Sequence, residues 1–169
     1  MTRVAQFLRV SPERFRADWE DALPGEPLPD FPALPRRATA GSAGYDFFSP
    51  LAFRLEPGES IRIPTGVRAR IAEGWVLMLF PRSGLGFKYR LQLNNTVGIV
   101  DADYFGARNE GHIFVKLTNA GEKTLSVGAG EAFAQGIFVP FGLTLDDEAA
   151  GARTGGFGST DARSRDGAP

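Results

Sequence analysis

The chain has 169 residues, of which 43% are hydrophobic and 23% are charged, a composition typical of one globular domain with a single hydrophobic core. Nineteen basic residues against twenty acidic residues give a net charge of -1, so the chain lacks the positive excess that drives binding to nucleic acid. The absence of cysteine and the single histidine exclude disulfides, thiol nucleophiles and metal sites made of cysteines or of several histidines.

The first residues contain no apolar stretch typical of a signal peptide, and no later apolar run is long enough to cross a bilayer. A chain without cysteine is compatible with a reducing cytoplasm. We therefore expect a soluble, cytoplasmic protein whose partners include neither membranes nor nucleic acid.

A short amphipathic helix is the first element that the sequence predicts. Ser11 can cap its start, and Pro12 suits its first turn. Phe15 and Trp19 then recur at helical spacing, and we expect this aromatic face to pack on the main body rather than to bind a ligand. Five prolines between residues 24 and 35 predict an extended connector after the helix.

Residues 36–145 have the pattern of an all-β domain made of short antiparallel strands. Apolar and polar residues alternate in several segments, and glycine-containing turns separate these segments. The clearest alternating segments are 61–63, 67–71 and 113–117. We expect a β-barrel or sandwich, preceded by an N-terminal region of residues 1–35. Residues 146–169 are rich in Gly, Ser, Arg and Asp and are expected to form a flexible C-terminal arm.

Residues 81–86 (PRSGLG) follow a predicted strand at residues 75–80 and are candidates for anion binding. They bring together a guanidinium, a hydroxyl and glycine backbone N–H groups, which are the groups found in phosphate and oxyanion cradles. A plain loop between two strands explains the same residues, so both interpretations stay open.

Residues 95–106 contain two closely spaced carboxylates. If this segment is an extended strand, Asp101 and Asp103 lie on one face with Ile99, where a buried carboxylate needs a polar partner. Asp101 is then a candidate general base, or the two carboxylates form a ligand pair for a divalent cation such as magnesium. Alternatively, Asp103 has only a structural role, in an Asx-type turn.

Two further features lie outside these segments. His112 is the only imidazole of the chain, and no candidate serine or cysteine partner accompanies it. We expect it to be a surface or turn residue without a catalytic role. Residues 153–160 combine a cation, hydroxyls, glycines and one aromatic ring, which predicts either a lid that stacks on a base and grips phosphate or an ordinary disordered tail.

Together these segments resemble the trimeric deoxyuridine triphosphate nucleotidohydrolases, or dUTPases. Five motifs in the order of that family can be matched within residues 36–160. They are residues 43–47 (AGYDF), 81–85 (PRSGL), 98–104 (GIVDADY), 130–135 (GEAFAQ) and 155–160 (GGFGST). The opening segment and residues 109–112 also resemble a variant from low-GC Gram-positive bacteria and their phages, in which the hairpin after the third motif is longer. The resemblance implies a jelly-roll-like β-barrel.

The same resemblance implies an enzyme that hydrolyses dUTP to dUMP and pyrophosphate, which limits uracil incorporation into DNA and supplies dUMP for dTMP synthesis. Asp101 matches the general base that activates water for in-line attack on the α-phosphorus. Mg2+ is the implied cofactor, and Asp46 matches a residue that contacts it indirectly, through water. The implied assembly is a homotrimer whose active sites are shared between chains.

For the nucleoside, Tyr104 matches the ring that packs under the deoxyribose and leaves no room for a 2′-hydroxyl. The backbone of Gly98, Ile99 and Val100 matches the segment that pairs with the uracil edge, and its narrow hairpin implies rejection of the thymine methyl. Asn95 lies where the family has an asparagine at the base pocket.

The remaining matches concern the triphosphate and the arm. Those in the barrel are Arg82, Ser83, Gly84 and Gln135, which match the phosphate grip. In the arm, Phe157 matches the ring that closes over uracil, and the residues that match its phosphate contacts are Gly158, Ser159 and Thr160. Arg153 lies one residue closer to Phe157 than the arginine of the family's arm often does, which leaves open whether it reaches the γ-phosphate.

Two other functions are compatible with the same fold. A dCTP deaminase needs an acid/base glutamate and a base site for cytosine, and it does not carry the third motif seen here. A regulatory or binding module would not need a water-activating base, so the joint presence of Asp101, Tyr104 and Phe157 favours the enzyme. Two positions depart from the dUTPase pattern, because Ala132 stands where arginine is common and Ala107 replaces a usual glutamate.

Overall fold

The computed structural model describes residues 2–149 and residue 151, which contain eleven strands, two α-helices and one 3-10 helix. In chain order these are β1 (Ala5–Arg9), α1 (Pro12–Ala22), β2 (Tyr45–Phe48), β3 (Phe53–Leu55), β4 (Ser60–Pro64), β5 (Val67–Ile71), β6 (Trp75–Pro81), α2 (Ser83–Tyr89), β7 (Leu91–Leu93), β8 (Gly98–Val100), η1 (Ala102–Gly106), β9 (Phe114–Asn119), β10 (Leu125–Val127) and β11 (Ala132–Pro140). Most of the expected arm lies outside the described residues, together with the fifth motif and Arg153, Phe157, Gly158, Ser159 and Thr160.

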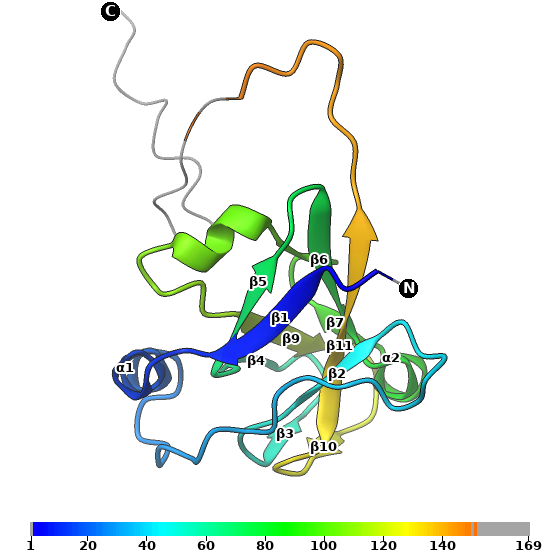
Figure 1. Cartoon of the computed structure of the whole chain (residues 1–169). Coiled ribbons are helices and arrows are strands. Elements are labelled where there is room, and N and C mark those ends of the chain that lie inside the picture. The colour runs from blue at the N-terminus through cyan, green and yellow to red at the C-terminus, as the bar shows by residue number, and fades with distance from the viewer. Residues whose placement is uncertain (1, 150, 152–169) are drawn as a thin grey trace, which may run out of the picture.

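The described strands form four antiparallel sheets around a shared core (Figure 1). The largest has the order β2-β11-β6-β8, the second has the order β4-β9-β7, and the pairs β1-β5 and β3-β10 complete the set. The strands predicted at residues 61–63, 67–71, 75–80 and 113–117 all form, with ends that differ by two residues or fewer. The prediction of an all-β fold of short antiparallel strands is therefore confirmed. No helix in the described part of the chain is long and apolar enough to span a membrane.

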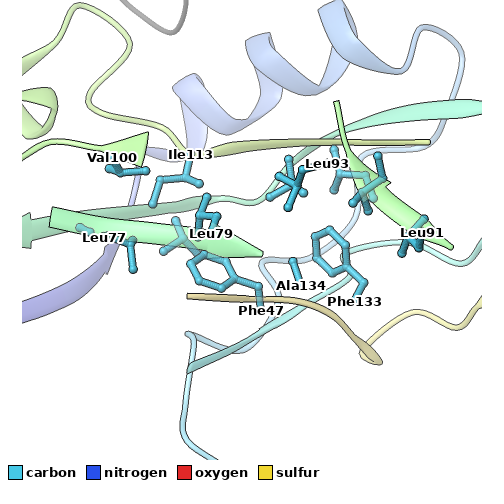
Figure 2. Packing of buried hydrophobic residues seen from close by; sticks show 14 of the residues in the cluster. Phe47, Leu77, Leu79, Leu91, Leu93, Val100, Ile113, Phe133 and Ala134 are labelled. Atoms are coloured by element: carbon cyan, nitrogen blue, oxygen red, sulfur yellow. The ribbon is translucent and has the colours of Figure 1, made fainter. Parts of the chain in front are cut away.

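Alternate residues of the strands fill the core. Leu77 and Leu79 of β6 are fully buried, and so are Val115 and Leu117 of β9. Lys116, between the last two, is exposed. Figure 2 shows the side chains of facing strands meeting in this layer. The period-two pattern thus places one face of each strand in the core, as expected for half-buried strands.

Helix α1 forms where the sequence predicts it. The hydroxyl of Ser11 accepts a hydrogen bond from the backbone N–H of Arg14 at 3.1 Å, and Pro12 is the first helical residue. Phe15 and Trp19 are 2% and 1% exposed, and the Phe15 ring contacts the His112 ring edge-on. The expectation that this aromatic face packs on the main body is confirmed.

A carboxylate from a distant loop completes the cap of α1. Glu110 accepts hydrogen bonds from the backbone N–H of Ser11 at 2.8 Å and from its hydroxyl at 2.6 Å. A negative charge at a helix N-terminus is favourable, because the backbone N–H groups there have no partner within the helix. The hydroxyl of Ser11 is the main reason that the pKa of Glu110 lies below its ordinary value of 4.5, although partial burial opposes the shift.

Replacing Glu110 with glutamine should remove a pH-dependent part of the stability. A carboxylate whose pKa is lowered by folding stabilises the protein above its unfolded-state pKa, and this contribution is lost as the pH falls through the folded-state pKa. We therefore expect a higher Tm for the unaltered protein than for E110Q near neutral pH, and a difference that shrinks as the pH falls below about 4.5. Thermal unfolding at several pH values checks this. A Tm difference independent of pH would contradict it.

Strand β1 is an element that the sequence analysis did not predict. It pairs antiparallel with β5, with Phe7 opposite Ala69. The Phe7 ring contacts the rings of Tyr45, Phe47 and Phe138, with centroids 5.4 to 5.6 Å apart. The N-terminal region is therefore bound to the barrel by a strand as well as by α1. Its five residues, three exposed and two partly buried, are too few for an alternation that can be distinguished from an irregular segment.

Candidate functional site

A pocket of about 590 Å³ lies beside α2. Its lining includes Arg82, Ser83, Gly86, Phe87, Gln135 and Ile137. Strand β6 ends at Pro81, Arg82 precedes the helix, and α2 begins at Ser83. The interpretation of residues 81–86 as a loop is wrong from Ser83 onward, because the chain is helical there. The backbone N–H of Gly86 donates a hydrogen bond to the Arg82 carbonyl at the start of this helix. Gly84 lies within that helix.

Strand β2 places Asp46 next to two residues of the pocket. Asp46 on β2 lies opposite Gln135 on β11, and its Oδ1 is 3.9 Å from Nε of Arg82. The Arg82 side chain stays 49% exposed beside this carboxylate and so can contact an anion. A Cβ on Gly44 would lie 2.7 Å from Oε1 of Gln135, so a larger residue there would displace the end of that side chain. The structure brings together the predicted residues Asp46, Arg82, Ser83 and Gln135.

Phe87 is a pocket residue that the sequence analysis missed. Its side chain is 92% exposed and lines the pocket. It follows Ser83 by four residues in α2, which places the two side chains on the same face of the helix. The signal in the sequence that could have identified Phe87 is an aromatic residue four positions after Ser83, a candidate phosphate contact.

Asp101 lies after the end of β8 rather than within a strand. Strand β8 ends at Val100, and the chain turns into η1, with the backbone N–H of Tyr104 donating to the Asp101 carbonyl at 3.2 Å. The expectation that Asp101, Asp103 and Ile99 share one face of a strand is therefore wrong. Asp101 and Asp103 are both exposed, and Ile99 is 44% exposed.

The residues that match the base-binding segment of dUTPases lie along β8 and in the turn before it. Gly98 packs closely on β6, since a Cβ at this position would lie 3.0 Å from Cβ of Leu79. Val100 is buried, and Ile99 between them faces outward. Asn95 is exposed in the turn before β8, where its carbonyl accepts a hydrogen bond from the backbone N–H of Val97 at 2.7 Å.

Tyr104 is buried in η1, with 1% of the residue exposed. Its hydroxyl donates to the carbonyl of His112 at 2.7 Å and accepts from the side-chain amide of Asn109 at 2.7 Å. Because the hydroxyl bonds within the chain, the ring is the part of Tyr104 that can shape a sugar pocket. Ala107, which ends η1, is 5% exposed, so a glutamate there would bury a carboxylate.

His112 is fully buried, so the expectation of a surface or turn residue is wrong. Its Nδ1 lies 2.6 Å from Oδ2 of Asp18 in α1, and its Nε2 accepts from the backbone N–H of Gly66 at 2.8 Å. Burial alone would raise the pKa of Asp18, but the hydrogen bond to His112 and the nearby Arg14 outweigh it and hold the pKa below its ordinary value of 3.8. The acceptor for His112 is therefore a carboxylate at neutral pH.

The candidate phosphate residues and Asp101 lie at opposite ends of β6. Strand β8 runs antiparallel to β6, with Val100 opposite Leu77. Asp101, the residue after Val100, therefore lies near the first residues of β6, whereas Arg82 comes directly after the last residue of β6. The strand from Leu77 to Arg82 spans roughly 17 Å at about 3.4 Å per residue. In Figure 1, α2 and the unlabelled yellow-green helix η1 accordingly lie on opposite sides of the barrel. One chain therefore does not bring Asp101 and Arg82 into a single site.

Comparison with known proteins agrees with the motifs. A model of the dUTPase family matches residues 32–161. The chain belongs to the dUTPase family. Among the curated dUTPases, that of Lactococcus lactis is 41% identical over 132 residues, covering 76% of this chain and 88% of the relative.

Solved dUTPase structures share the fold. The crystal structure of dUTPase from Streptococcus mutans has a TM-score of 0.61 at 35% identity, covering 82% of this chain and 97% of that one. A mutant dUTPase from phage phi11 of S. aureus, described with a coordinated structural Mg(II) ion, has a TM-score of 0.63 at 22% identity and covers 88% and 98%. The predicted resemblance to dUTPases, including those of Gram-positive bacteria and their phages, is confirmed.

Proposed function

We propose that this chain hydrolyses dUTP to dUMP and pyrophosphate. The observation that carries the proposal is the pocket beside α2, where Arg82, Ser83 and Gln135 from the second and fourth dUTPase motifs line one cavity. A guanidinium, a hydroxyl and a carboxamide suit the charged oxygens of a triphosphate, and Gly84 completes the same motif. The reaction would limit uracil incorporation into DNA and supply dUMP for dTMP synthesis in the cytoplasm.

Asp101 is the general base in this proposal. Its carboxylate takes a proton from a water molecule, and the water oxygen forms a bond to the α-phosphorus. The bond between that phosphorus and the oxygen bridging to the β-phosphate breaks, and pyrophosphate leaves. Asp101 is exposed directly after β8, where a bound nucleotide and its water can reach it.

A magnesium ion would be held mainly by the triphosphate. No three acidic or histidine side chains among residues 2–149 and 151 form a metal site, so a cage of protein ligands does not fit. A hydrated ion held through water does fit Asp46, which lies next to Arg82 at the pocket. When bound, Mg2+ neutralises part of the charge of the triphosphate.

Strand β8 and η1 are proposed to select the nucleoside. In the described part of the chain β8 is the edge strand of its sheet, so the backbone of Gly98, Ile99 and Val100 can offer hydrogen bonds to a uracil edge, with Asn95 nearby. The buried ring of Tyr104 would form a rigid apolar wall beneath the sugar, which disfavours a 2′-hydroxyl.

The sharing of active sites between the chains of a homotrimer is also part of the proposal. The distance between Asp101 and Arg82 along β6 supports it, because a site that uses both needs a second chain. Three apolar residues that alternate after β11 are exposed, namely Phe141, Leu143 and Leu145, and this segment leaves the body of the barrel (Figure 1). An exposed apolar series of this kind is typical of an interface. The proposed arm residues are Arg153, Phe157, Gly158, Ser159 and Thr160, with Phe157 closing over uracil and the others contacting phosphate.

The test is release of pyrophosphate from dUTP, UTP, dTTP and dCTP by the unaltered protein with Mg2+. We expect kcat/KM for dUTP to exceed that for each other nucleotide by about 10²-fold or more, because the Tyr104 ring disfavours a 2′-hydroxyl and the backbone of β8 pairs with uracil and leaves no room for a methyl. Comparable turnover of UTP would indicate a broader nucleotidase. Ammonia released from dCTP would favour the deaminase, and no turnover of any nucleotide would favour a binding module.

A further inference from the structure

Helix α1 precedes the segment matched to the dUTPase family, which begins at residue 32, yet it is bound to the loop after the third motif. We call residues 109–112 of this loop the clamp loop. Helix α1 and its capping residue make two polar contacts with it. They join Ser11 to Glu110 and Asp18 to His112. The clamp loop begins three residues after the end of η1, so these contacts connect α1 to the segment that contains Tyr104 and follows Asp101.

The Ser11 contact holds the clamp loop in an unfavourable conformation. Glu110 has a φ of 59°, a left-handed conformation that is costly for a residue with a side chain. Gly111 has a φ of 68°, and a Cβ there would lie 2.6 Å from the Tyr104 carbonyl oxygen. The clamp loop therefore packs directly on the backbone of Tyr104, and the two hydrogen bonds from Ser11 to Glu110 stabilise this shape.

Gly66 and Asp18 hold the imidazole of His112 by its two ring nitrogens. The backbone N–H of Gly66 donates to Nε2 at 2.8 Å, so Nε2 carries no proton and the ring proton is on Nδ1. That proton is donated to Oδ2 of Asp18, 2.6 Å away. Without Asp18, the buried Nδ1–H would lose its acceptor, and a buried donor without an acceptor is energetically unfavourable.

Hydrogen bonds continue from the clamp loop to the third motif. The carbonyl of His112 accepts from the Tyr104 hydroxyl, and the Asn109 amide donates to the same hydroxyl, both at 2.7 Å. The backbone N–H of Tyr104 donates to the carbonyl of Asp101 at 3.2 Å. A continuous chain of contacts thus runs from α1 to the residue proposed as general base.

We propose that α1 positions the third motif, with Asp18 acting through His112 and Ser11 acting through Glu110 to hold Tyr104 and Asp101 in place. The inference rests on the proposed function of those two residues. Docking of α1 does not depend on these polar contacts, because Phe15 and Trp19 already bury its apolar face. Asp18 and Ser11 are therefore positioning residues for the reaction.

The test compares Asp18→Ala and Asp18→Asn with a matched control, Asp21→Asn. Asp21 is on the same helix and pairs with Arg62 of β4 at 3.1 Å, away from the clamp loop. We expect Asp18→Ala to lower kcat for dUTP by roughly 10- to 100-fold, since small misplacements of reacting groups are costly, and to lower the preference for dUTP over UTP. Asp18→Asn keeps an oxygen acceptor for Nδ1–H and should recover most of both losses, while Asp21→Asn should match the unaltered protein.

Amide hydrogen exchange of residues 101–112 gives a second measurement that needs no substrate. We expect faster exchange in Asp18→Ala and in Ser11→Ala, and unchanged exchange in Asp21→Asn. If the unaltered protein does not hydrolyse dUTP but exchange follows this order, the proposed function fails and the positioning of the loop stands. If dUTP is hydrolysed and folded Asp18→Ala keeps the kcat, the preference for dUTP and the slow exchange, the positioning proposal is overturned. Should Asp18→Ala fail to fold, Ser11→Ala and Asp18→Asn decide by the same two measurements, and normal values in Ser11→Ala would overturn the proposal.

Discussion

Replacing Asp101 with asparagine is expected to lower kcat for dUTP hydrolysis by roughly 10²- to 10⁴-fold, the loss typical of removing a positioned general base. Asparagine has nearly the same shape as aspartate but cannot accept the proton of the attacking water. The binding of dUTP should stay close to that of the unaltered protein, because the triphosphate is held at the pocket beside α2 and not by Asp101. Steady-state kinetics and equilibrium binding of a non-hydrolysable analogue measure the two effects separately.

Asp103→Asn is the matched control for this prediction. Asp103 is an exposed carboxylate two residues farther along, within η1, which Asp101 immediately precedes. If only Asp101 acts as the base, Asp103→Asn should keep kcat within a few-fold of the unaltered value. Equal losses in the two variants, with a changed dependence on Mg2+ concentration, would instead favour the pair of carboxylates as metal ligands.

Two inactive variants, Arg82→Ala and Asp101→Ala, should regain activity when their subunits are allowed to exchange. Arg82 and Asp101 of one chain lie at opposite ends of β6, so a site that uses both takes them from different chains. In a mixed assembly, some sites receive Arg82 from the Asp101→Ala chain and Asp101 from the Arg82→Ala chain. With equal amounts and random exchange, about a quarter of the sites combine the two intact residues.

The measurement is dUTP turnover before and after exchange, with the mixed assemblies identified by native mass spectrometry. Mixing each variant with a second sample of itself is the control and should yield no recovery. If mixed assemblies form and turnover stays at the level of the separate variants, both residues of a site belong to one chain. Recovery that precedes exchange would also count against sharing.

Local signals in the sequence were sufficient for α1 and for four of the strands, namely β4, β5, β6 and β9. The cap formed by Ser11, the proline after it and the spacing of Phe15 and Trp19 all act within a few residues, so a helix could be predicted without the rest of the fold. Strands β4 and β5 were predictable for the same reason, because their alternation is complete within five residues. Strand β6 was predictable as a short, continuous apolar run.

Features that depend on distant contacts could not be predicted in this way. Helix α2 includes Gly84 and Gly86, which disfavour a helix locally, so residues 81–86 were interpreted as a loop. The burial of His112 depends on Asp18, 94 residues earlier in the chain. A histidine beside Glu110 in a polar stretch gives no local sign of such a partner.

The candidate site was predictable by residue type but not by arrangement. The motifs identified Arg82, Ser83 and Gln135, and the fold brings these three to one pocket. The distance between Asp101 and Arg82 follows only from the antiparallel pairing of β8 with β6. The positions of residues 153–160 lie outside the described chain, and their roles stay predictions.

Hydrolysis of dUTP in water enriched in oxygen-18 tests the central claim most directly. If the chain directs water to the α-phosphorus, the heavy oxygen must appear in the phosphate group of dUMP, and the pyrophosphate must carry none from the cleavage step. Mass spectrometry of both products gives the position of the label. Label in the pyrophosphate with unlabelled dUMP would place the attack on the β-phosphorus, and release of inorganic phosphate with dUDP would show a different reaction; either result would contradict the account.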